Sequence, residues 1–164
     1  MNVGGNRNLA VPIGKYYVAI EPITLTCIGL GSCLAIALYD PDRGIGSMAH
    51  TMLPNYSEGL DKENPGKYTD IAIYLMVDEL TELGAWKGGL KAKIAGGAQM
   101  FQSFDGEGLD IGMRNVDAAI ETLEKEGIAL VSKHVGGSRG RNIWFDVRTG
   151  VIDLQMGRDE IIRI

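Results

Sequence analysis

The organisation of this chain follows from residues 29–53, which read GLGSCLAIALYDPDRGIGSMAHTML. At the centre of this stretch lies a turn over residues 40–44, where proline presets φ, aspartate caps the turn and glycine closes it. The apolar run 34–39 before the turn is typical of a buried strand, and residues 45–53 after it predict a second strand. We therefore expect these two strands to form an antiparallel hairpin.

The segments around this hairpin predict a mixed α/β fold. Further strands are expected at residues 16–20, 23–28, 90–95, 128–135, 142–147 and 151–154, and helices at residues 68–83 and about 115–126. Hairpins come first and two helices follow, which favours a layered α/β domain over a fully alternating βαβ fold. We expect one domain over residues 1–164, in which residues 1–14 form a flexible N-terminal tail.

Composition excludes several classes of protein. Glycine is unusually frequent, with 23 of 164 residues, but it shows no G-X-Y period, and a hydrophobic content of 45% is too high for a disordered linker. The 16 basic and 21 acidic residues give a net charge of −5 without a basic run, so no nucleic-acid partner is expected. Since the sequence carries no apolar segment of membrane-spanning length and no signal peptide, we expect a cytoplasmic protein without membrane insertion.

Cys33 and His50 are the candidate catalytic pair. Cys33 follows two glycines at the start of the first hairpin strand, and His50 lies near the end of the second, so antiparallel pairing brings both toward one end of the hairpin. An imidazole beside a thiol can take the thiol proton and later protonate the leaving group. The alternative is structural: Cys33 is a small buried hydrophobe and His50 a half-buried strand residue.

The glycines before Cys33 also suggest where negative charge is stabilised. A glycine-permitted turn leaves backbone N–H groups free to face a ligand, and those of Ser32 and Cys33 would then bind the oxyanion of an attacked carbonyl. We expect no metal site and no cofactor, because the chemistry of this pair requires neither.

The same stretch resembles the CheD family of chemoreceptor glutamine deamidases. The similarity rests on GLGSC followed by GSMAHTMLP, and on the separation of Cys33 from His50. Other blocks occur in the same order, namely KYTD (67–70), AKIAGGAQMF (92–101), IGMRN (111–115) and GGSRGR (136–141) leading to Phe145. The resemblance covers about residues 15–154.

This resemblance implies a three-layer α/β sandwich, similar in its site to cysteine-hydrolase toxins that deamidate GTPases. It implies that Cys33 and His50 hydrolyse glutamine side chains on the cytoplasmic helices of chemoreceptors to glutamate, in receptor adaptation. It also implies a partner, the CheC phosphatase, which competes with the receptors.

One position departs from the family pattern. The family usually has a threonine where Cys27 stands, and that threonine helps to orient the histidine. Thr26 cannot simply replace it, because neighbouring side chains of a strand face opposite ways. Three possibilities follow: the Cys27 thiol holds the imidazole, a backbone carbonyl orients His50 instead, or this chain acts mainly by binding. Cys27 also raises the possibility of an oxidative disulfide with Cys33.

The expected reaction is a two-step acyl transfer through a thioester on Cys33. The main alternative is a catalytically weak interaction module that binds receptors and CheC. A third possibility is a cysteine hydrolase acting on another amide or ester, such as a glutamyl methyl ester, since both substrates pass through the same thioester.

Overall fold

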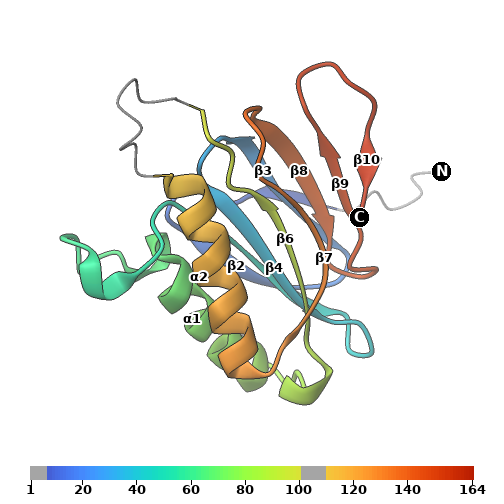
Figure 1. Ribbon diagram of the computed structural model, residues 1–164. Coiled ribbons are helices and arrows are strands. Elements are labelled where there is room, and N and C mark those ends of the chain that lie inside the picture. The colour runs from blue at the N-terminus through green and yellow to red at the C-terminus, as the bar shows by residue number, and fades with distance from the viewer. Residues whose placement is uncertain (1–6, 101–109) are drawn as a thin grey trace.

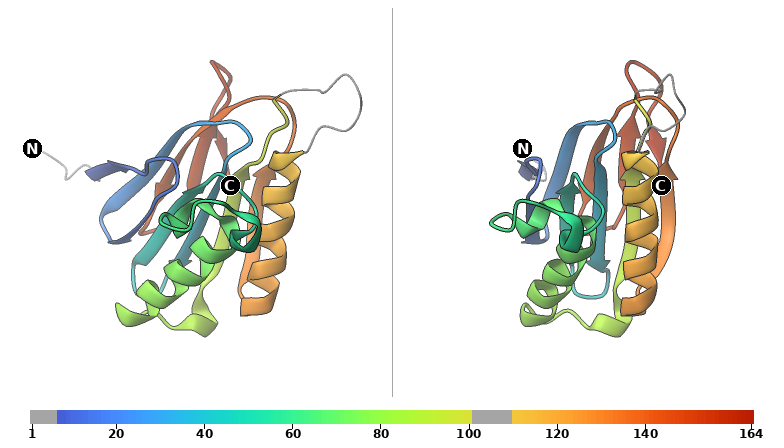
Figure 2. Two further views of the ribbon diagram at one scale, coloured as in Figure 1. Left: turned by 90° about the vertical axis from the view of Figure 1, so that its left-hand side faces the viewer. Right: turned by 60° about the vertical axis from the view of Figure 1, so that its left-hand side comes forward.

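The computed structural model describes residues 7–100 and 110–164 and contains two sheets and two main helices. One sheet has the strand order β2-β5-β4-β6-β7 and the other the order β1-β3-β8-β9-β10. Figures 1 and 2 show both helices on one face of the first sheet and the second sheet on its other face. The expected layered α/β sandwich is confirmed.

The elements have the following bounds. The strands are β1 (Arg7–Ala10), β2 (Tyr16–Ile20), β3 (Ile23–Leu30), β4 (Leu34–Asp40), β5 (Ile45–Thr51), β6 (Lys91–Gly96), β7 (Ala129–Val135), β8 (Arg141–Asp146), β9 (Ile152–Gln155) and β10 (Ile162–Arg163). The helices are α1 (Thr69–Glu82) and α2 (Ile111–Glu126), with short 3-10 turns at Tyr56–Glu58, Pro65–Lys67 and Lys87–Gly89. Within the described ranges, no helix is both long and apolar enough to cross a membrane.

The hairpin of β4 and β5 lies at the middle of the first sheet. Every residue of both strands is buried, because helices cover one face and the second sheet covers the other. Their antiparallel register places Ala35 opposite His50 and Asp40 opposite Ile45. The predicted hairpin is therefore confirmed, with β6 completing the other side of β4.

Two apolar cores result from this layering. The helix-side core includes Leu34, Ile36 and Ala49 together with apolar residues of α1 and α2. The inter-sheet core includes Ala35, Met48 and Cys27. Alternate residues of β4 and β5 thus enter different cores, as the two-residue period of a strand requires.

Two expectations need correction, and one strand was not predicted. Arg7–Ala10, assigned to a flexible tail, forms β1 in parallel pairing with β3, and Val11 is buried. An exposed four-residue strand has no apolar alternation, so the sequence pattern does not predict that it pairs.

Helix α2 begins at Ile111 instead of about 115, because the Asp110 side chain accepts a hydrogen bond from the Met113 N–H and caps the helix. The two-residue strand β10 was not expected at all. Residues 1–6 of the expected tail lie outside the described residues.

Gly96 brings the end of β6 directly against the segment that connects β3 with β4. Its φ of +111° lies in the region that favours glycine, and a Cβ atom there would lie 2.5 Å from the Cys33 carbonyl oxygen. The next residue, Gly97, donates its N–H to the same oxygen at 2.9 Å. The glycine pair thus permits a close approach of two backbones at Cys33.

We predict that Gly96→Ala displaces Cys33, whereas Gly127→Ala does not. Gly127 also has a positive φ, +68°, but an added Cβ would meet nothing within 4 Å. Each change should cost about 1–2 kcal/mol of unfolding free energy through backbone strain, and Gly96→Ala should cost more because of the clash. Urea unfolding and the rate of Cys33 alkylation check this; equal effects of the two variants on both quantities would contradict it.

Candidate active site

The Cys33 loop, Gly31 to Cys33, joins β3 to β4 across the seam between the two sheets. It follows a register irregularity between Cys27 and Leu30, where Gly29 adopts a φ of +73°. This positive φ is accessible to glycine and costly for other residues. The segment GLGSC therefore leads the chain from one sheet to the other. Its last residue, Cys33, lies directly before β4 and is partly exposed.

All three carbonyls of the Cys33 loop are held by the protein. Gly31 accepts from the Ala98 N–H at 2.9 Å, Ser32 from the Asn115 side-chain amide at 3.0 Å, and Cys33 from the Gly97 N–H at 2.9 Å. In a trans peptide the N–H points opposite to the C=O. The N–H group of Ser32 therefore points away from Ala98, and that of Cys33 points away from Asn115.

His50 shares the inter-sheet face with both cysteines. It lies opposite Ala35 and two residues after Met48, and both of these side chains belong to the inter-sheet core. Cys27 belongs to the same core and Cys33 packs against it. The structure thus brings the three sequence-predicted side chains to one side of the β4–β5 hairpin.

The imidazole of His50 is fixed in one tautomer. Its Nδ1 lies 3.3 Å from the Val11 carbonyl oxygen, which can only accept, so Nδ1 carries the proton and Nε2 the free lone pair. The side chain is 2% exposed, and in residues 7–100 and 110–164 Nε2 has no hydrogen-bond partner. A buried acceptor without a partner is costly, and such groups call for a functional explanation.

Residues 11–15 form a strap that fixes His50 from both sheets. The Val11 N–H donates to the Thr26 carbonyl of β3 at 2.8 Å, and the Gly14 N–H donates to the His50 carbonyl of β5 at 2.7 Å. The His50 N–H in turn donates to the Lys15 carbonyl at 2.9 Å. Val11, which was expected to lie in a flexible tail, thereby directly contacts His50.

Cys27 is fully buried beside Cys33. Burial raises the pKa of the Cys27 thiol, and the nearby Cys33 raises it further. The described hydrogen bond of His50 Nδ1 goes to Val11 and not to this thiol. Thr26 pairs with Trp144 on the adjacent strand, and its side chain alternates away from that of Cys27, as expected.

The protonation states of the pair follow from burial. Burial raises the pKa of the Cys33 thiol, although its own backbone N–H opposes the rise. Burial lowers the pKa of His50, although the bond to Val11 opposes the fall. Both shifts favour the neutral thiol of Cys33 and the neutral imidazole of His50.

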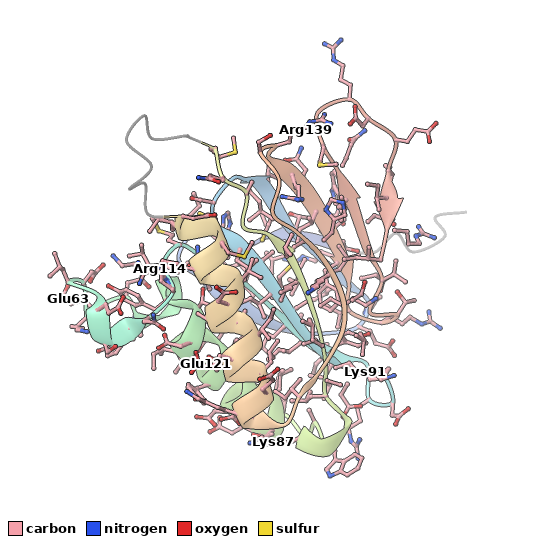
Figure 3. All side chains as sticks on the ribbon, in the orientation of Figure 1. Glu63, Lys87, Lys91, Arg114, Glu121 and Arg139 are labelled. Carbon is pink, nitrogen blue, oxygen red and sulfur yellow. The ribbon has the colours of Figure 1, made fainter. Side chains whose placement is uncertain are left out.

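Elements far apart in sequence surround the Cys33 loop. The β3–β4 connection, the end of β6, the start of α2 and the β7–β8 turn lie around it; Figure 3 labels Arg114 near the start of α2 and Arg139 in the β7–β8 turn. A pocket of about 130 Å³ opens beside the loop and is lined by Ser32, Ala98, Gln99, Met100, Asp110, Ile111 and Gly112. Across the described part of the chain, no group of three or more His, Cys, Asp or Glu side chains could hold a metal ion.

Sequence reasoning missed two contributors to this site. Asn115 was quoted only within a family-like block, and Val11 carried no motif. The Gly96–Gly97 pair lies within the family-like block AKIAGGAQMF, and its close contact with Cys33 gives a structural reason for both glycines. A buried asparagine in the first turns of an amphipathic helix is the one signal that would have pointed to Asn115, since such a side chain must find partners.

Comparison with known proteins identifies the family. A family model described as CheD chemotactic sensory transduction matches residues 52–156, which begin just after His50. A Thermotoga maritima protein named chemoreceptor glutamine deamidase CheD is 44% identical over 140 residues, covering 85% of this chain and 86% of the relative.

Two further relatives are named probable chemoreceptor glutamine deamidase CheD. The protein of Desulforamulus reducens is 40% identical over 152 residues, which cover 92% of each chain. That of Clostridium kluyveri is 42% identical over 159 residues, covering 94% of this chain and 98% of the relative. Because the family model spans more than half of the residues and the relatives align over most of the length, this chain belongs to the CheD family.

Proposed function

We propose that this protein is a chemoreceptor glutamine deamidase, which hydrolyses the side-chain amides of selected receptor glutamines to glutamate in chemotaxis. The observation that carries the proposal is the buried His50 imidazole, whose Nε2 has no partner among the described residues and whose Nδ1 is held by Val11. A base fixed in this way, on the same inter-sheet face as Cys33, is suited to taking a thiol proton. The names of the relatives supply the substrate.

The first step forms a thioester. His50 Nε2 takes the thiol proton as the Cys33 sulfur attacks the γ-carbonyl of glutamine. The transfer occurs during the attack because the raised pKa of Cys33 and the lowered pKa of His50 keep the thiol protonated before it. The N–H groups of Ser32 and Cys33 bind the oxyanion. The imidazolium then protonates the departing nitrogen, which leaves as ammonia.

The second step regenerates the enzyme. Neutral His50 takes a proton from water, the resulting hydroxide attacks the thioester carbonyl, and the C–S bond breaks to give glutamate and the Cys33 thiol. The overall reaction consumes one water and releases one ammonia per glutamine. Neither step uses a metal or an organic cofactor.

We assign the orientation of His50 to the Val11 carbonyl, and we assign to Cys27 a packing role. The 3.3 Å contact with Val11 supports the second of the three possibilities for the missing threonine. Since chemoreceptor helices that undergo adaptation lie in the cytoplasm, this function would place the protein there. The family resemblance further supports CheC as a partner that competes for the receptor.

The pair should be tested directly on receptor glutamines. We expect the wild type to convert glutamine to glutamate in the receptor cytoplasmic domain of its organism, as mapped by mass spectrometry. Cys33→Ala and His50→Ala should each lower the rate of glutamine conversion by at least about 10³-fold, since each deletes one half of the acyl-transfer pair. Conversion that survives Cys33→Ala would exclude the nucleophile, and a wild type that binds the receptor without conversion would favour the interaction module.

Cys27→Ala should leave kcat within about threefold of the wild type. The backbone carbonyl of Val11 stays in place in this variant and keeps the imidazole oriented. Loss of a fully buried small side chain should lower the unfolding free energy by about 1 kcal/mol. A stable Cys27→Ala protein with a hundredfold lower kcat, rescued by Cys27→Thr, would instead assign the orienting role to residue 27.

Alkylation of Cys33 by iodoacetamide should rise with pH through a midpoint above that of an ordinary thiol, about 8.5. The reason is that burial raises the pKa of the Cys33 thiol and lowers that of His50, so a thiolate–imidazolium pair is disfavoured at neutral pH. The rate should be measured between about pH 5 and pH 10, with Cys33→Ala correcting for reaction at Cys27. A midpoint below about 7 would indicate a preformed ion pair.

A further inference from the structure

Asn115 joins the two chain segments that carry the catalytic pair. Its Nδ2 donates to the Ser32 carbonyl at 3.0 Å and to the Met52 carbonyl at 3.1 Å. Ser32 immediately precedes Cys33, and Met52 follows His50 by two residues. One side-chain amide on α2 therefore holds the Cys33 loop to the end of β5.

The orientation of this amide is unambiguous. Both groups facing Nδ2 are backbone carbonyls, which only accept, so the nitrogen with its two hydrogens must face them. The Oδ1 atom lies 3.5 Å from the Thr69 hydroxyl. Asn115 is fully buried, so it cannot touch a substrate and can act only through the groups it holds.

Two threonine hydroxyls lie beside this amide. The Thr69 hydroxyl lies 2.8 Å from the Thr51 hydroxyl and 3.5 Å from Asn115 Oδ1, and the Thr51 hydroxyl lies 3.3 Å from the Leu34 carbonyl oxygen. Because each hydroxyl carries one hydrogen, the two threonines cannot make all three bonds at once. The Ser32 carbonyl is therefore the group next to Cys33 that Asn115 itself holds.

Resting on the proposed function, we infer that Asn115 is a positioning residue that builds the oxyanion hole. By holding the Ser32 carbonyl, it fixes the Ser32–Cys33 peptide so that the Cys33 N–H faces the opposite way, toward the attacked carbonyl. Without the amide the Ser32 carbonyl loses its described hydrogen bond, so this peptide is fixed only through the flanking Gly31 and Cys33 carbonyls. The loss should fall on the transition state, in which the oxyanion develops, and not on substrate binding.

The test compares two reactions of Cys33 that differ in their need for an oxyanion hole. Acylation by p-nitrophenyl acetate passes through a tetrahedral oxyanion, whereas alkylation by iodoacetamide is a displacement at carbon and forms none. We expect Asn115→Ala to slow acylation about 10- to 100-fold, which is less than the roughly 10²- to 10³-fold cost of deleting an oxyanion donor, because the Cys33 N–H is still present and only its direction is released. Alkylation should stay within about threefold, with the same pH midpoint. Glutamine conversion should lose kcat to a similar degree, with KM within about twofold.

Controls separate positioning from loss of structure. Thr122→Val is the matched control, because Thr122 is also a buried polar residue of α2 but has no described contact with the Cys33 loop. It should leave both reactions within about twofold. Asn115→Ser provides a second variant that keeps a hydroxyl but is too short to reach both carbonyls, and it should show the same split. All assays are run well below the unfolding temperature of each variant.

The outcomes distinguish this inference from the proposed function. Unchanged acylation in Asn115→Ala and Asn115→Ser, or acylation and alkylation falling in parallel, would overturn the positioning role. A lower acylation rate with an unchanged alkylation rate supports the positioning role of Asn115. This holds even if the wild type converts no receptor glutamine, because the acetate ester reports on the oxyanion hole without the receptor. A wild type that acylates normally but converts no glutamine would overturn the proposed function alone.

Discussion

The site depends on the antiparallel register of β4 and β5, in which Ala35 lies opposite His50. Because side chains alternate along a strand, this register sends His50 to the inter-sheet face that Cys33 also borders. A slip of one residue would turn the imidazole into the helix-side core. Both strands are wholly buried, so such a slip would exchange every side chain between two filled cores and is strongly opposed.

The position of the site between two sheets explains its electrostatics. Layers on both faces remove water from His50 and much of the water from Cys33, and burial therefore favours the neutral form of each. Nε2, which has no partner among residues 7–100 and 110–164, keeps its direction because the Val11 carbonyl binds the other ring nitrogen. A base kept neutral and oriented is ready to accept a proton at the moment of attack, which is what acyl transfer requires.

Much of this organisation was predictable because it depends on local patterns. The turn at residues 40–44 and the apolar run before it specify the β4–β5 hairpin, and Gly127 ends α2 in the left-handed conformation expected of a C-cap glycine. Strand β1 and the strap could not be predicted in this way. The exposed Arg7–Ala10 has no apolar period, and its parallel pairing with β3 is a contact between different segments.

The sequence by itself pointed to the side chains proposed to react, Cys33 and His50, and determined the hairpin that brings them toward one end of the fold. Tertiary structure alone decided which atom orients the imidazole and which amide holds the Cys33 loop. Those partners, the Val11 carbonyl and the Asn115 side chain, come from a terminal segment and from a helix distant in sequence. A backbone carbonyl is present at every residue and an asparagine has no fixed partner, so only packing of the layers can select the ones that act.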